Sequence, residues 1–97
     1  RIWALFYLIE ILRISQVVPT QNALRFAEVE ESDLLALLAK HHQGDWGDVC
    51  EEDRESNEEA LLMHLRILSS YNFSKDKIWI ITEADRSVTT ILLPSDY

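Results

Sequence analysis

Cysteine, glycine and proline are scarce in this sequence of 97 residues, which has one cysteine, two glycines and two prolines. The single cysteine, Cys50, excludes an intramolecular disulfide and favours a reducing compartment, so we expect a cytoplasmic protein. Glycine and proline are too few for a flexible linker, and no internal repeat is present. At this length the sequence predicts one domain with a single modest core.

Catalytic motifs are missing as well. The sequence has no Gly-x-Ser-x-Gly elbow, no phosphate-cradling glycine loop, no EF-hand spacing and no paired-histidine signature of a zinc peptidase. Its nine basic residues are dispersed from Arg1 to Arg86, which disfavours direct binding of nucleic acid. The sequence therefore favours a non-enzymatic protein without a metal or other cofactor.

The longest apolar run, residues 2–12, is interrupted only by Glu10. It is shorter than the roughly 20 residues that span a bilayer, and no small-residue cleavage site follows it, so no membrane role is expected. A run that is apolar on all sides should be buried in the core or against a second copy of the chain. We treat residues 1–13 as an apolar N-terminal extension, foreign or variable, and residues 14–97 as the domain.

Negative charge is concentrated in one third of the chain. Residues 28–59 contain twelve of the 17 acidic residues against only Lys40 and Arg54, which gives this segment a net charge of −10. The rest of the chain, with seven basic and five acidic residues, has a net charge of +2. Such a field repels nucleic acid and anionic lipid and attracts cations or basic protein surfaces.

Helix signals fill the first two thirds of the domain. Residues 16–18 are expected to form a short extended piece that Pro19 ends, and Thr20 is expected to cap a helix over residues 21–27. Ser32 is the expected cap of a second helix, with Asp33 in its first turn. That helix should reach residue 42 and be terminated by a left-handed glycine, Gly44, before a tight loop in which Trp46 is buried.

A third helix is expected to begin near Val49 or at Ser56, because residues 56–59 match the capping box. Leucines with helical spacing extend it to residue 68, and His64 is expected to lie inside it as a hydrogen-bonded core residue. The remaining β-rich segments, 71–73, 77–83 and 88–93, predict strands. The fold class is thus α+β, with two or three helices packed on a C-terminal three-stranded antiparallel β-meander.

The central strand of this meander is apolar on both faces. Ile78 and Ile80 share one face, while Trp79 and Ile81 share the other. If the helices cover one face only, the N-terminal extension or a second subunit must cover the other. This pattern predicts a homodimer as the alternative to an acidic binding protein.

Several segments of the domain resemble those of a group of small bacterial proteins associated with plasmids and other mobile elements. They are QVV at 16–18, GDWGD at 44–48, EED at 51–53, NEEAL at 57–61, RILSSY at 66–71 and IWIITEADRSVTTILLP at 78–94. The resemblance covers residues 16–97 and excludes the N-terminal extension. It implies a mobile-element origin and, through some members of the group, a link to restriction–modification systems, but it assigns no catalytic residue.

The acidic tract at 45–59 is the candidate partner-binding site. Duplex DNA carries one negative charge about every 1.7 Å of its axis, so a rigid acidic surface can occupy a DNA-binding groove as a mimic. The expected partner is a basic protein surface, such as that of a nucleic-acid-acting host enzyme inhibited in the anti-restriction or anti-CRISPR manner. A solvated helix face is the simpler interpretation. The assigned residues are Asp45, Trp46, Asp48, Glu51, Glu52, Asp53, Glu55, Glu58 and Glu59.

Two enzymatic alternatives are weaker. A metal-dependent centre could use donors from His41 and His42 to Asp53, although imidazoles in the last turn of a helix interact well with its negative end without any metal. A hydrolytic centre could use Glu83, Asp85, Arg86 and Ser87 at the last hairpin. In the simpler interpretation, Asp85 and Arg86 shape the turn and Glu83 pairs with a neighbouring basic residue.

Overall fold

The computed structural model describes residues 15–30, 33–73 and 75–97, so the N-terminal extension and Ser32 lie outside the described residues. In that part of the chain, four strands form one sheet in the order β1-β4-β3-β2, with β1 parallel to β4 and the other pairs antiparallel. The strands are β1 (Gln16–Pro19), β2 (Ile67–Asn72), β3 (Lys77–Thr82) and β4 (Val88–Leu92).

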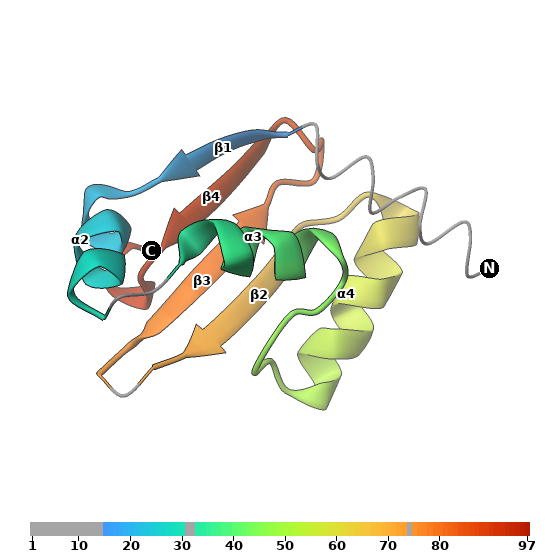
Figure 1. The fold of residues 1–97 in the computed structure, drawn as a ribbon. Helices are drawn as coiled ribbons and strands as arrows, with labels where there is room; N and C mark the ends of the chain where they lie inside the picture. The colour runs from blue at the N-terminus through green and yellow to red at the C-terminus, as the bar shows by residue number, and fades with distance from the viewer. Residues whose placement is uncertain (1–14, 31–32, 74) are drawn as a thin grey trace.

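Helices lie across the sheet and beside it. They are α2 (Gln21–Val29), α3 (Leu34–His42) and α4 (Glu51–Met63), with a short 3-10 helix, η1 (Pro94–Asp96), at the C-terminal end. Figure 1 shows α3 crossing one face of the sheet, α2 beyond the end of β1, and α4 next to the outer strand β2. The α+β class predicted from the sequence is confirmed.

The predicted three-stranded antiparallel meander is wrong, because the sheet is mixed and has a fourth strand, β1. The short extended piece before Pro19 pairs with β4: the Gln16 amide donates to the Ser87 carbonyl at 2.9 Å, and the Thr20 amide donates to the Ile91 carbonyl at 2.8 Å. Paired residues of the two strands, such as Gln16 and Val88, lie 72 positions apart in the sequence. No local sequence pattern reports a pairing between segments so far apart.

The first two helices begin near their predicted starts. Thr20 caps α2 as expected, since its hydroxyl accepts from the Ala23 amide at 3.0 Å. Asp33 is itself the N-cap of α3, where one carboxylate oxygen accepts from the amides of Leu35 and Ala36 at 3.0 and 3.3 Å, so its placement in the first turn is wrong. Gly44 has the predicted left-handed backbone, with a φ of 82°.

The third helix differs most from the prediction. It begins at Glu51, close to the predicted alternative near Val49, so Ser56 lies inside it and no capping box forms there. It ends at Met63, and His64 has a left-handed backbone with a φ of 55° and is exposed, not in the core. The leucine spacing to residue 68 is misleading because β2 begins at Ile67, which is fully buried and pairs with Thr82. Sheet pairing outweighs helical propensity here.

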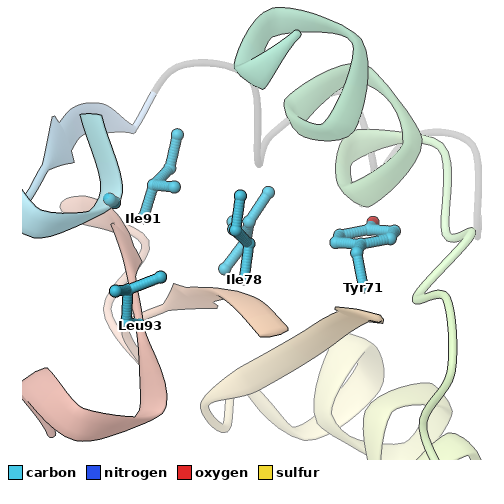
Figure 2. Close-up of a cluster of buried hydrophobic side chains, with 6 residues drawn as sticks. Tyr71, Ile78, Ile91 and Leu93 are labelled. Atoms are coloured by element: carbon cyan, nitrogen blue, oxygen red, sulfur yellow. The ribbon is translucent and has the colours of Figure 1, made fainter. Parts of the chain in front are cut away.

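Two apolar clusters form the core. The larger lies between the sheet and helices α2 and α3, and Figure 2 shows Tyr71, Ile78 and Ile91 directed from their strands toward the helices. Its buried members are Ala23, Tyr71, Ile78, Ile80, Ile91 and Leu93. The second cluster joins α4 to the sheet and contains Trp46, Ala60, Leu61 and Ile67. The predicted burial of Trp46 is confirmed, with 3% of its surface exposed.

The second face of the sheet is partly covered by the chain itself. Ile81 is buried, and Trp79 is half-buried beside Tyr97, whose ring lies edge-on at a centroid distance of 5.9 Å. Ile81 therefore does not need a second subunit to remove it from water. Pairing of two copies through Trp79 stays a prediction, which sedimentation of the protein alone will check.

Candidate protein-binding surface

The loop between α3 and α4 closes the outer edge of β2. Trp46 and Asp48 form a parallel bridge around Ser70, in which the Ser70 amide donates to the Trp46 carbonyl at 3.0 Å and the Asp48 amide donates to the Ser70 carbonyl at 2.6 Å. Gly47 lies between them with a φ of 73°. The loop therefore acts as a short additional edge segment of the sheet.

The two loop carboxylates predicted to bind a partner, Asp45 and Asp48, accept hydrogen bonds from backbone amides of the same chain. Asp48 accepts from the Asn72 amide at 3.0 Å, and Asp45 accepts from the Gly47 amide at 3.3 Å. The Tyr71 hydroxyl donates to the Asp45 carbonyl at 2.7 Å, and burial raises the pKa of Tyr71 to about 12, so this donor keeps its proton. Asp45 and Asp48 thus hold the loop, and replacing them would test the fold as well as binding.

Helix α4 is fixed to the same edge by Asn57. Its carboxamide donates to the Leu68 carbonyl at 2.7 Å and accepts from the Leu68 amide at 3.1 Å, so it replaces a neighbouring strand at that residue. Satisfied edge groups cannot template pairing with another chain. Because Asn57, Ala60 and Leu61 face the sheet and are buried, the opposite side of α4 faces solvent.

That solvent side of α4 is acidic. With 100° between successive residues, Glu51, Glu55 and Glu59 lie opposite the buried side chains. Within the described part of the chain, the only ion pair on this helix joins Arg54 to Glu51, at 3.9 Å. The acidic face, as we call it below, consists of the exposed acidic residues of the helix, among which Asp53 lies one turn before the buried Asn57 and therefore toward the sheet side of the helix start. These residues are Glu51, Glu52, Asp53, Glu55, Glu58 and Glu59.

Part of this charge also stabilises the helix. Glu51, Glu52 and Asp53 occupy the first turn of α4, where the partial positive charge of the helix N-terminus favours carboxylates. Glu55, Glu58 and Glu59 lie beyond that turn. No hydrogen bond or ion pair involves the side chains of these three residues in the ranges that the structure describes, so they are the clearest candidates for contact with a partner.

The nine residues assigned from the sequence therefore separate into three groups. Trp46 is buried in the core, so its side chain is not on the surface. Asp45 and Asp48 are exposed but hold the loop. The other six form the acidic face. The sequence could not separate these groups, because the separation depends on which side of α4 meets the sheet.

His41 is the centre of a buried hydrogen-bond chain. Its Nδ1 lies 2.5 Å from the Ser69 hydroxyl and its Nε2 lies 2.7 Å from the Thr82 hydroxyl. The chain continues from Thr82 to Thr89 at 2.9 Å and from Thr89 to Ser15 at 2.5 Å. The sequence signal for this chain is the polar residues Ser69, Thr82 and Thr89, which occupy inward-facing positions of otherwise apolar strands. This signal did not enter the predictions made from the sequence.

In this arrangement His41 is not available as a metal ligand, as the metal-dependent alternative requires. Both ring nitrogens are engaged by hydroxyls, and the side chain is fully buried. No group of three or more histidine, cysteine, aspartate or glutamate side chains in the described ranges could hold a metal ion. The Ser69 hydroxyl lies next to the His41 imidazole, which is the arrangement of a nucleophile and its general base. Because both side chains are buried, no substrate can reach the hydroxyl.

The charge state of His41 makes stability depend on pH. Burial lowers the pKa of His41 to about 3, and the positive charges of His42 and Arg86 add to this effect. In the unfolded chain the pKa is about 6.5, so between these values the unfolded chain binds a proton that the folded chain excludes. We expect the free energy of unfolding to fall with decreasing pH in this window, by at most about 1.4 kcal/mol per pH unit from this residue.

Urea unfolding between pH 7 and pH 4 measures this slope. The variant His41→Gln should lose stability less steeply than the wild type as the pH falls, because the group that titrates is gone. His64→Gln removes an exposed histidine outside this hydrogen-bond chain and is the control for the loss of one histidine. Equal slopes for the wild type and His41→Gln would contradict a neutral buried His41.

The residues of the proposed hydrolytic centre have separate structural roles. Asp85 accepts from the Ser87 amide and hydroxyl at 3.0 and 2.6 Å, and these bonds lower its pKa. Glu83 pairs with Arg66 across the neighbouring strands at 3.1 Å. Arg86 donates to the main-chain carbonyls of Ala60, Leu65 and Glu83. The two carboxylates have separate partners, and the simpler interpretation of a shaped turn fits these contacts.

A shallow depression of about 580 Å³ lies at the hairpin between β2 and β3. None of the candidate catalytic or partner-binding residues borders it. The depression is lined by Asn72, Phe73, Lys75, Asp76, Lys77, Trp79 and Pro94. Its charged lining residues, Lys75, Asp76 and Lys77, belong to none of the candidate sites.

Comparisons with protein-family models, with characterised proteins and with solved structures find no match to this chain. Across the described ranges, no helix has both the length and the apolar character needed to cross a bilayer. Function must therefore be argued from the acidic face and the contacts that orient it.

Proposed function

We propose that this chain is a non-enzymatic binding protein of mobile-element origin that acts through its acidic face on a basic surface of a partner protein. The observation that carries the proposal is the fixed orientation of α4. Asn57 and the buried residues Ala60 and Leu61 hold the helix against the sheet edge, so the carboxylates of the opposite side are exposed together.

Electrostatics give this surface its selectivity. The side chains of Glu55, Glu58 and Glu59, which lie beyond the first turn of α4, are free to attract an oppositely charged surface and to speed its association. The effect weakens as salt rises, because the Debye length falls to about 8 Å at physiological ionic strength and to about 3 Å at 1 M. A nucleic-acid-acting host enzyme has the required basic surface, and the resemblance to mobile-element proteins favours that class of partner.

The test is capture of proteins from a nuclease-treated bacterial lysate, followed by elution in a salt gradient. Glu55, Glu58 and Glu59 are replaced together by lysine in one variant and by glutamine in another. We expect the wild type to capture a basic protein that elutes as salt rises, the glutamine variant to release it earlier, and the lysine variant to capture none. Circular dichroism confirms that each variant is folded.

A matched control separates local charge from net charge. Glu28→Lys on α2 changes the net charge by the same amount as Glu55→Lys on α4, and Figure 1 shows these helices at opposite ends of the molecule. Capture should be weakened by the single change on α4 and unaffected by the one on α2. Equal effects would show that only net charge matters, and capture that is insensitive to salt would refute the proposal.

A further inference from the structure

The solvent side of α4 changes character at its C-terminal end. After Glu58 and Glu59 come two apolar residues that are largely exposed, Leu62 at 52% and Met63 at 62%. Leu65, just beyond the helix, is 49% exposed. We call these three residues the apolar tip. Contiguous exposed apolar residues that are bordered by polar ones mark interaction sites, whereas singly scattered ones are ordinary.

The apolar tip and the acidic face form one surface. Residues three and four apart in a helix are neighbours on the same side, so Leu62 lies one turn beyond Glu58 and Glu59. Met63 likewise lies one turn beyond Glu59. One surface of a partner can therefore contact both the carboxylates in the last turns of α4 and the apolar tip.

The backbone that presents the apolar tip is held in place. The Leu65 amide donates to the Ala60 carbonyl at 3.1 Å, and the Leu65 carbonyl accepts from the Arg86 guanidinium at 2.6 Å. The left-handed residue His64 turns the chain between these two bonds. A surface whose backbone is already fixed loses little conformational entropy when a partner binds it.

We infer that the apolar tip anchors the partner, and that the partner is a protein whose basic surface borders an apolar pocket. This inference rests on the proposed function and specifies its binding chemistry. A groove built for the DNA backbone would receive the carboxylates but leave Leu62 and Met63 against charged or hydrated groups. In the partner that we infer, an apolar pocket buries the apolar tip, and lysine or arginine side chains beside the pocket pair with Glu55, Glu58 and Glu59. Both the apolar and the charged part of the surface then have a complementary contact.

The two halves contribute to different steps of binding. Exposed charges attract the partner at long range and set the association rate, which depends on salt. Apolar side chains buried at contact mainly slow dissociation, and anchors of this kind dominate the affinity of protein interfaces. Loss of the apolar tip should therefore weaken binding without changing its dependence on salt.

Two synthetic peptides serve as probes in place of the natural partner. One is an amphipathic helix made of leucine and lysine, with leucine on one side; the other is an oligolysine with the same number of lysines. We expect the leucine–lysine peptide to bind the wild type at least about tenfold more tightly than oligolysine. Leu62→Gln/Met63→Gln should remove this advantage and leave the salt dependence of both peptides unchanged.

Leu35→Gln is the matched control, because Leu35 is an apolar residue that is 76% exposed and belongs to another helix, α3. It should leave the affinity for both peptides as in the wild type. If both peptides bind the wild type equally tightly, or if the double variant keeps the preference, the anchor is refuted while the acidic face stands. If neither peptide binds in a salt-dependent manner, the proposed function fails together with the anchor.

Discussion

Gly47→Ala is expected to lower the free energy of unfolding by about 3 kcal/mol, through left-handed backbone strain and a steric clash together. A β-carbon at this position would lie 2.3 Å from the Ser70 carbonyl oxygen and 2.7 Å from the Tyr71 ring. The carbonyl cannot move aside, because it accepts from the Asp48 amide at 2.6 Å. The substitution should therefore detach the loop from the edge of β2.

Thermal or urea unfolding of the wild type and the variant measures this loss. Gly44→Ala is the matched control: Gly44 also has a positive φ, so that variant reports the cost of left-handed alanine at the end of α3. The difference between the two alanine variants isolates the contribution of the close contact with β2. If Gly47→Ala were no more harmful than Gly44→Ala, the bridge to Ser70 would not be tight.

Arg86→Met should lower the free energy of unfolding by a similar amount, about 3 kcal/mol, since hydrogen bonds from a charged donor are worth about 1.5–3 kcal/mol each. Arg86 is 8% exposed, and its guanidinium donates to the carbonyls of Leu65, Glu83 and Ala60 at 2.6, 3.2 and 2.7 Å. Methionine keeps the apolar stem but leaves these carbonyls without that donor. The positive charge at the C-terminus of α4 is lost as well.

Arg66→Met provides the comparison, because Arg66 is exposed and pairs with Glu83 on the surface. Surface ion pairs contribute little, so this variant should unfold almost as the wild type does. Arg86→Lys keeps the charge but not the fork of donors, and its stability should lie between those of the wild type and Arg86→Met. A small effect of Arg86→Met would mean that the turn after Met63 forms without its guanidinium.

Local signals in the sequence were sufficient for several elements of this fold. The start of α2 was predicted from Thr20, which precedes an amphipathic segment, and the end of α3 was predicted from Gly44. These predictions succeeded because helix caps depend only on neighbouring residues. Burial of Trp46 followed from its place in a tight loop. The three C-terminal strands were expected from β-branched and aromatic residues, although β2 begins earlier than predicted.

The errors arose where distant segments decide the local structure. The strand role of residues 16–19 depends on β4, and the end of α4 depends on the pairing of Ile67 with Thr82. Capping-box residues at 56–59 proved to be helical because Asn57 binds the edge of β2. The candidate site could be located from its charge alone, but its division into exposed, loop-holding and buried residues required the orientation of α4.

The tautomer of His41 determines which groups donate and which accept in the buried hydrogen-bond chain. A neutral imidazole has one donor and one acceptor nitrogen. With the proton on Nδ1, Ser69 accepts, and Thr82, Thr89 and Ser15 must each donate toward the ring; with the proton on Nε2, Ser69 donates, Thr82 accepts, and the bonds from Thr82 to Thr89 and from Thr89 to Ser15 can take either direction. The tautomer of His41 therefore fixes the direction of the two bonds to its ring, and in the Nδ1 form it fixes every bond as far as Ser15, next to the start of β1.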